Sequence, residues 1–155
     1  MHIVLVEPEI PGNTGNIARL CAATGTHLHL VRPFGFTIND KYLKRAGLDY
    51  WNLLDVHYYD SVYEVLVKYP ESPKFLLTSH AHKSYTSVKY GPESLLILGR
   101  ETKGLPEKFR MEYPEDCVRI PMIKEARCLN LANSAAIVLY EALRQNNFDR
   151  EEGTI

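Results

Sequence analysis

Short apolar runs recur along the chain, and most of them are closed by Gly, Pro or Ser. Runs of this length without polar alternation are typical of strands that are buried on both faces of a parallel sheet. They predict strands at residues 3–6, 28–31, 75–77, 95–98 and 118–120.

Helical spacing of apolar residues separates these runs. It predicts helices at residues 14–24 after a capping Asn13, at 41–45 after Asp40, at 62–68 after Asp60, and at 131–145. The last helix has small residues along one face, which favours close packing against another helix. Strands that alternate with helices predict an α/β fold with a mostly parallel, doubly wound sheet flanked by helices.

The length of 155 residues fits a single domain, 1–155, and the acidic segment at 149–155 is expected to form a frayed tail. No apolar run approaches the roughly 18 residues of a membrane span, and the first residues form a strand pattern instead of a charged leader. We therefore expect a cytoplasmic protein that does not enter a membrane. The three cysteines are widely spaced without a Cys-x-x-Cys pair, which argues against a disulfide framework.

The formal net charge of −1 lacks the basic excess of a nonspecific phosphate binder. Basic residues nevertheless gather locally. The clusters are Lys41 with Lys44 and Arg45, Lys103 with Lys108 and Arg110, and Lys124 with Arg127. Each cluster alone is more simply interpreted as solvated surface, but a neutral total can still contain a basic face.

In an open α/β sheet, ligands bind at the carboxyl ends of the strands, so the loops there are the candidate sites. The loop after the first strand contains two prolines, two glycines and two asparagines before Arg19. The Arg19 guanidinium lies near a helix start and is placed to bind a phosphate. A surface salt bridge is the alternative role for Arg19.

The loop after residues 95–98 reads Gly99-Arg100-Glu101-Thr102-Lys103-Gly104. A glycine at each end suits a ligand that lies against main chain, with Glu101 fixing the loop or accepting hydrogen bonds from an amine. A plain turn is the alternative. The chain has neither Gly-x-Gly-x-x-Gly nor a Gly-Lys-Ser/Thr ending, which disfavours NAD and ATP sites.

The segment before the last helix places Asn130 to begin that helix, and alone it is more simply a capped core helix. His80 and His82 alternate along an extended segment, but no third metal ligand stands at a fixed offset from them. No Gly-x-Ser-x-Gly elbow is present. We therefore expect neither a metal site nor a serine hydrolase.

Three motifs follow one another along the chain: Asn13-Thr14-Gly15-Asn16 with Arg19, Gly99-x-Glu101-x-x-Gly104-Leu105, and Arg127-x-Leu129-Asn130-Leu131. In order and separation they resemble the three motifs of the SPOUT methyltransferases, over nearly the whole chain. Two further segments, Glu7-Pro8-Glu9-Ile10-Pro11 and Gly47-Leu48-Asp49-Tyr50, are similar to the minimal single-domain tRNA (cytidine/uridine-34-2′-O)-methyltransferases.

The resemblance implies a C-terminal trefoil knot, which is an exception to the rule that chains do not thread loops. It also implies the cofactor S-adenosyl-L-methionine, with S-adenosyl-L-homocysteine as product. The expected cofactor contacts are Leu77, Thr78, Gly99, Glu101, Gly104, Ile120, Met122, Cys128, Leu129 and Asn130. Cys128 and Ala132 stand where the family usually has serine. A main-chain contact at Cys128, which we favour, leaves affinity intact, whereas a hydroxyl contact would lower it.

The resemblance further implies a homodimer whose active sites are completed across the interface, with tRNA as the partner. The catalytic group is expected to comprise Arg19, Asn13, Asn16 and Glu101. Arg19 would order the substrate phosphate and help the ribose 2′-hydroxyl lose its proton. The expected dimer or RNA contacts are Asn133, Ser134, Tyr140, Lys41 and Arg45, although Tyr140 fits an ordinary half-buried tyrosine equally well.

Three other functions stay open. A SPOUT enzyme acting on another tRNA position or on rRNA differs only in the site of methylation. A noncatalytic RNA-binding SPOUT domain would bind RNA without methyl transfer, but Arg19, Glu101 and Asn130 are all retained. A flavodoxin-like nucleotide-binding domain would bind a flavin, but the chain lacks its phosphate loop.

Overall fold

The computed structural model describes residues 1–37 and 54–148. Within these ranges, seven strands form one sheet in the order β3-β2-β1-β6-β4-β7-β5, and each neighbouring pair is parallel. The strands are β1 (His2–Val6), β2 (His27–Val31), β3 (Val56–Tyr59), β4 (Lys74–Leu77), β5 (Lys83–Ser84), β6 (Leu95–Leu98) and β7 (Cys117–Arg119). The helices are α1 (Pro11–Thr24), α3 (Val62–Lys68), α4 (Glu107–Glu112) and α5 (Leu131–Gln145). The predicted parallel α/β fold is confirmed.

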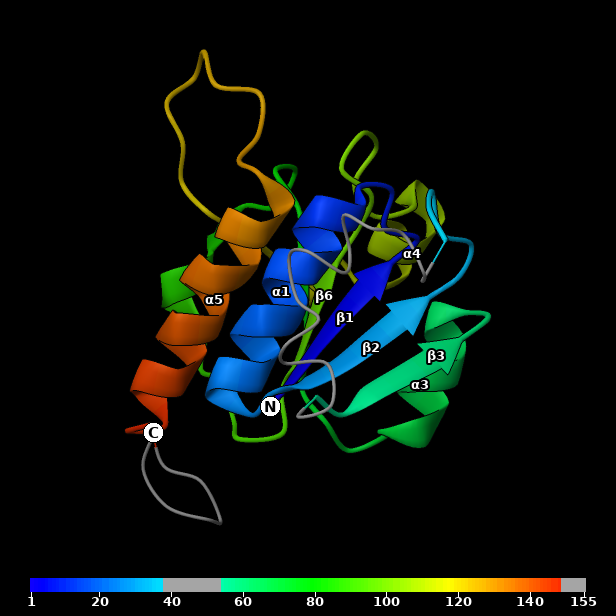
Figure 1. Ribbon diagram of the computed structural model, residues 1–155. Coiled ribbons are helices and arrows are strands. Elements are labelled where there is room, and N and C mark those ends of the chain that lie inside the picture. The colour runs from blue at the N-terminus through cyan, green and yellow to red at the C-terminus, as the bar shows by residue number, and fades with distance from the viewer. Residues whose placement is uncertain (38–53, 149–155) are drawn as a thin grey trace.

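Helices cover both faces of the sheet, which explains why its central strands β1 and β6 are apolar except for His2. In Figure 1, α1 and α5 lie side by side in front of the sheet. Ile3 and Leu5 of β1 pack into the core beneath these two helices. Val4 and Val6 point to the opposite face, into the core that α3 and α4 cover. Successive side chains of a strand alternate between faces, so β1 serves both cores.

One predicted helix start and two predicted capping residues are wrong, whereas α3 spans residues 62–68 as predicted. Helix α1 begins at Pro11, with Ile10 at the capping position, so Asn13 lies inside the first turn. Proline suits that first turn because the missing N–H has no helical partner there. Helix α3 is capped by Ser61, whose hydroxyl accepts a hydrogen bond from the Tyr63 amide at 3.2 Å, and not by Asp60.

The start of α5 is as predicted: the Asn130 side chain accepts hydrogen bonds from the amides of Ala132 and Asn133. Strands β3 and β5 and helix α4 were not predicted. Strand β7 ends at Arg119, so Ile120 already belongs to the following loop.

The predicted helix at 41–45 and the predicted tail at 149–155 lie outside the described residues. In the parts of the chain that the structure describes, no helix is both long enough and apolar enough to cross a membrane. The trefoil knot stays a prediction of the family resemblance.

Candidate active site

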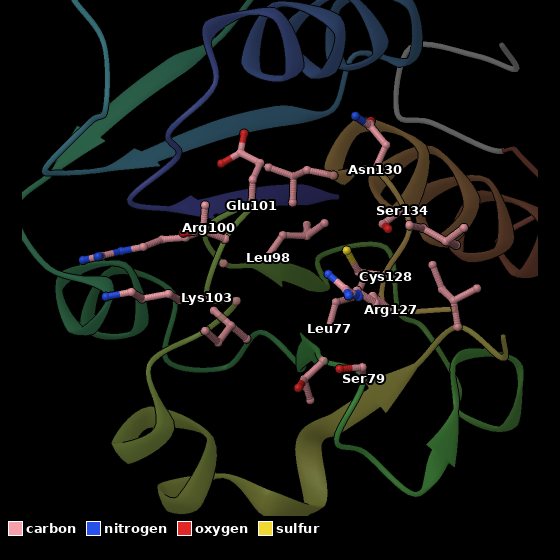
Figure 2. A pocket seen from close by; sticks show the side chains of 18 of the residues that line it. Leu77, Ser79, Leu98, Arg100, Glu101, Lys103, Arg127, Cys128, Asn130 and Ser134 are labelled. Atoms are coloured by element: carbon pink, nitrogen blue, oxygen red, sulfur yellow. The ribbon is translucent and has the colours of Figure 1, made fainter. Parts of the chain in front are cut away.

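A pocket of about 550 Å³ opens at the carboxyl ends of β4, β6 and β7. It lies between the loops that follow these strands and the start of α5, and Figure 2 shows their side chains around it. The order β6-β4-β7 brings these loops together, although 17 residues lie between β4 and β6 and 18 between β6 and β7 in sequence. The site therefore lies where ligands bind in parallel α/β sheets.

The Glu101 carboxylate ties the loop after β6 to the start of α1. Its Oε2 accepts a hydrogen bond from the Glu9 amide at 2.8 Å, and its Oε1 accepts from the Ile10 amide at 3.2 Å. The Asn13 side-chain amide donates to the same Oε1 at 3.0 Å. Because three donors from one helix start surround this carboxylate, Glu101 positions the loop and is not placed as a proton acceptor.

Asn13 connects these hydrogen bonds to the loop between β7 and α5. Its Oδ1 accepts a hydrogen bond from Asn130 Nδ2 at 2.9 Å, while its own Nδ2 donates to Glu101. Asn130 Oδ1 in turn accepts from the first amides of α5. Three side chains, Glu101, Asn13 and Asn130, therefore connect the three sequence motifs, and we call them the motif network.

The glycines Gly99 and Gly104 allow the loop after β6 to fold back on itself. Arg100 and Gly104 exchange main-chain hydrogen bonds of 3.2 and 2.8 Å, which folds the loop back on itself. A Cβ at Gly99 would overlap the main chain of Gly104 and Leu105, whereas the space beside Gly104 is open. Gly104 has a φ of 67°, in the left-handed region that favours glycine. Gly99 is thus needed for the closure of the loop itself.

The pocket combines apolar walls with a basic rim. Leu77, Leu98, Ile120 and Leu129 line it, as expected for a site that holds a flat aromatic group. Its charged lining residues are Arg100, Lys103, Arg110, Arg127 and one carboxylate, Glu101. Arg100 is also ion-paired with Glu7. Positive charge beside an apolar pocket suits a ligand next to a phosphate backbone.

All ten residues that were predicted to contact a cofactor line this pocket, and so do Asn13 and Ser134. Asn16 and Arg19 do not line it but are exposed on α1. Asn133 and Tyr140 are exposed on α5, and Lys41 and Arg45 lie outside the described residues. The sequence analysis missed Ser79, His80, Leu98 and Arg100 as lining residues, although their positions at strand ends would have indicated them.

Replacing Glu101 with alanine is expected to lower the free energy of unfolding by about 1.5–3 kcal/mol, because it leaves the Glu9 and Ile10 amides without their charged acceptor. Urea denaturation followed by circular dichroism measures this loss. Glu101→Gln is the matched control, since it keeps one carbonyl acceptor and should lose clearly less. Equal stability of the alanine variant and the parent chain would contradict the positioning role.

Known proteins are similar to this chain in sequence and in fold. Residues 1–140 match the SpoU rRNA Methylase family. The tRNA (cytidine(34)-2′-O)-methyltransferase of Methylovorus glucosotrophus is 46% identical over 147 residues, covering 94% of this chain and 96% of that protein. A Geobacillus stearothermophilus relative is 50% identical over 151 residues, which cover 96% of each chain.

Solved structures agree with the sequence comparison. One, described as giving structural insights into the 2-OH methylation of C/U34 on tRNA, has a TM-score of 0.88 at 38% identity and covers 96% of this chain and 97% of its own. The SpoU methyltransferase AviRb from Streptomyces viridochromogenes, in complex with AdoMet, has a TM-score of 0.80 at 28% identity and covers 96% of this chain and 61% of its own. With 140 of its 155 residues matched, the chain belongs to the SpoU rRNA Methylase family.

Proposed function

We propose that this chain transfers the methyl group of S-adenosyl-L-methionine to the ribose 2′-hydroxyl of nucleotide 34, the wobble position of tRNA. The observation that carries this proposal is the 46% identity, over 94% of the chain, to a protein named for that reaction. The matched length includes all three loops of the pocket. The solved structure that concerns C/U34 of tRNA covers the same length and supports the same substrate.

The pocket fits the proposed cofactor. Its volume of about 550 Å³ lies within the range of roughly 300–1,000 Å³ that is usual for small-molecule sites. Leu77, Ile120 and Leu129 offer apolar walls for an adenine ring, and the exposed main chain around Cys128 offers polar atoms. When bound, S-adenosyl-L-methionine supplies an electrophilic methyl group on a sulfonium, so the chemistry belongs to the cofactor.

The residues of the chain then contribute positioning and electrostatics. The motif network holds the three loops in one arrangement. Lys103, Arg110 and Arg127 at the pocket are placed to attract the phosphates that flank the target ribose. Arg19, in our proposal, binds the phosphate and lowers the cost of removing the 2′-hydroxyl proton.

Because Arg19 lies outside the pocket of its own chain, we propose that it acts in a homodimer, at the pocket of the second copy. Ile10, at the start of α1, and Ile137 and Tyr140 on α5 are exposed hydrophobic side chains. Ile137 and Tyr140 stand three residues apart and therefore share one face of α5 with Asn133. An apolar helix face with small polar neighbours beside the pocket is suited to a self-complementary contact between two copies.

Methyl transfer from labelled S-adenosyl-L-methionine to tRNA tests this function directly. The tRNA comes from a strain that lacks the protein, and the modified nucleotide is mapped afterwards. A 2′-O-methyl group at position 34 is the expected result. A mark at another position would overturn the assigned target but keep the reaction, and cofactor binding without any transfer would overturn the enzymatic role.

Replacing Cys128 with serine is expected to change the cofactor dissociation constant by less than about threefold, which is under 1 kcal/mol. The reason is that Cys128 is proposed to contact the cofactor through its main chain, which the substitution preserves. Calorimetric titration of both chains with S-adenosyl-L-homocysteine measures the difference. A gain in affinity of tenfold or more for the serine variant would show that a side-chain hydroxyl contacts the ligand.

A further inference from the structure

Four histidines lie close together near the amino ends of β1, β2 and β3, whereas the pocket lies at the carboxyl ends of the strands. The strand register pairs His2 with His27 and His29 with His57. Strands covered on both faces normally carry aliphatic side chains at such positions. Four imidazoles there replace apolar packing with groups that can donate, accept or bind a metal ion.

The two inner histidines are engaged with one another. His2 Nδ1 lies 2.9 Å from His29 Nε2, and both rings are almost fully buried. This inner pair forms a fixed layer on which the outer rings stack: His27 on His2 at 4.8 Å and His57 on His29 at 5.2 Å between ring centroids.

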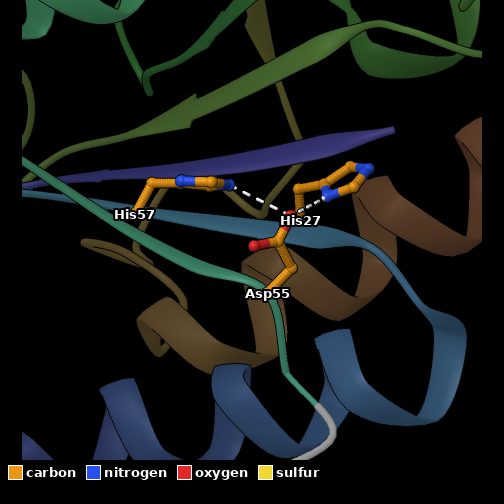
Figure 3. A group of neighbouring side chains, drawn as sticks. All are labelled: His27, Asp55 and His57. Atoms are coloured by element: carbon orange, nitrogen blue, oxygen red, sulfur yellow. Dashed lines mark hydrogen bonds and ion pairs between the residues drawn. The ribbon is translucent and has the colours of Figure 1, made fainter.

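The two outer histidines converge on one carboxylate. Asp55 Oδ2 lies 2.7 Å from His27 Nδ1 and 3.0 Å from His57 Nε2. One ligand atom from each of the three residues lies within 4.8 Å of the other two. Figure 3 shows both rings directed at Asp55 from the neighbouring strands β2 and β3. Stacking on the inner pair holds each ring in this orientation.

We propose that His27, Asp55 and His57 bind a divalent transition-metal ion of the Zn²⁺ type. Two imidazole nitrogens and one carboxylate oxygen are the donors such ions prefer, whereas Mg²⁺ and Ca²⁺ favour oxygen ligands. Ligand atoms of a tetrahedral zinc ion stand roughly 3.4 Å apart. The two histidine–carboxylate pairs therefore need to open by less than about 1 Å, and the two histidine nitrogens, which lie within 4.8 Å of each other, need to close by up to about 1.4 Å. The site goes beyond the proposed methyl transfer and does not depend on it.

Binding requires a shift of protons within the same three residues. Each histidine must present an unprotonated nitrogen to the metal. The proton that a ring now shares with Asp55 moves to its other nitrogen, or to solvent if that ring carries two protons. Asp55 binds the ion as a carboxylate, and binding involves no change of oxidation state.

The surroundings indicate a structural role. The side chains of His27, Asp55 and His57 are 41%, 55% and 31% exposed, so water can fill the remaining coordination position. Within the described residues, β3 is an edge strand that pairs with β2 alone. An ion held by His27 on one strand and by Asp55 and His57 at the start of the other would clamp this edge strand in register.

Titration of the untagged full chain, stripped of metal with EDTA, tests the site with Co²⁺ alone and then with Zn²⁺ as competitor. Visible absorption of Co²⁺ should show one equivalent bound per chain, displaced by Zn²⁺ but not by Mg²⁺. Asp55→Asn and His57→Ala should each weaken Co²⁺ binding by at least about tenfold, because one of three protein ligands is lost. His82→Ala is the matched control and should bind Co²⁺ as the parent chain does, since His82 is an exposed histidine elsewhere.

A second measurement needs no variant. In the unsubstituted chain, Zn²⁺ should shift the imidazole nitrogen resonances of His27 and His57, and leave those of His80 and His82 unchanged. Absence of stoichiometric binding would overturn the proposal and leave a hydrogen-bonded triad only. Equal loss of binding in His82→Ala, or equal competition by Mg²⁺, would also overturn it, because either result indicates nonspecific surface binding.

Discussion

Replacing Arg19 with alanine is expected to reduce methyl transfer to tRNA by at least about 100-fold, because the variant lacks the proposed charge at the phosphate and the 2′-hydroxyl. Binding of the cofactor should be nearly unchanged, since Arg19 does not line the pocket of its own chain. Transfer from labelled S-adenosyl-L-methionine and calorimetric titration with S-adenosyl-L-homocysteine measure the two effects. Normal turnover of the variant would exclude the proposed role.

Mixed dimers of the proposed homodimer test which copy supplies this side chain. An Arg19→Ala chain keeps its pocket, and a chain with a disrupted pocket keeps its Arg19. If Arg19 acts across the interface, a dimer of the two contains one complete site, and mixing should restore part of the activity. If Arg19 acts within its own chain, both sites stay defective and mixing restores nothing. Arg19→Lys controls for charge alone, and should remain well below the parent because it lacks the bidentate guanidinium.

The second large effect is expected at Gly99. A Cβ at this position overlaps the main chain of Gly104 and Leu105, so Gly99→Ala must force the loop open. We expect a loss of about 1–3 kcal/mol in the free energy of unfolding, as for other overpacked positions. Cofactor affinity should fall at least about tenfold, because the displaced loop forms one wall of the pocket. Urea denaturation and calorimetry measure the two losses.

Alanine at two other glycines, Gly104 and Gly12, distinguishes steric overlap from backbone strain as the cause of this loss. Gly104→Ala adds a methyl group to open space but keeps a φ of 67°, so it should cost only about 1–2 kcal/mol from backbone strain. Gly12 lies in α1 with no atom within 4 Å of an added Cβ, and Gly12→Ala should stabilise the chain slightly. If Gly99→Ala lowered the free energy of unfolding and the cofactor affinity no more than Gly12→Ala does, the predicted steric overlap at Gly99 would be contradicted.

Much of the site was predictable because its residues lie where strands end. The second and third motifs lie in the loops after β6 and β7, and a parallel sheet places the carboxyl ends of such strands side by side. Asn130 was correctly predicted to cap α5 from its local sequence alone. Asn13 was not correctly assigned, since an asparagine near a helix start resembles a cap. Only the tertiary structure shows that Glu101 and Asn130 occupy both ends of its side chain.

Other features depend on register, which the sequence does not reveal. His27 and His57 are 30 residues apart, and they approach Asp55 because β2 and β3 pair with a particular alignment. A shift of β3 by one residue would turn the His57 ring to the opposite face of the sheet, away from His27. In the sequence, His80 and His82 were the candidate metal ligands because they are close to each other along the chain. The proposed ligands His27 and His57 are far apart along the chain and are brought together by strand pairing. Strand β3 was missed because it lacks a continuous apolar run: two of its four residues, His57 and Tyr58, are polar or exposed.

The motif network has a thermodynamic consequence. It joins the first turn of α1, the loop after β6 and the start of α5, so these segments shift together or not at all. Arg19 stands six residues beyond Asn13 on the same helix, and a helix transmits a tilt of its first turn along its length. A ligand that moves the loop after β6 would therefore also change the direction in which Arg19 is presented. In that case, reciprocity requires that tRNA bound by Arg19 and cofactor in the pocket change each other's affinity by the same factor.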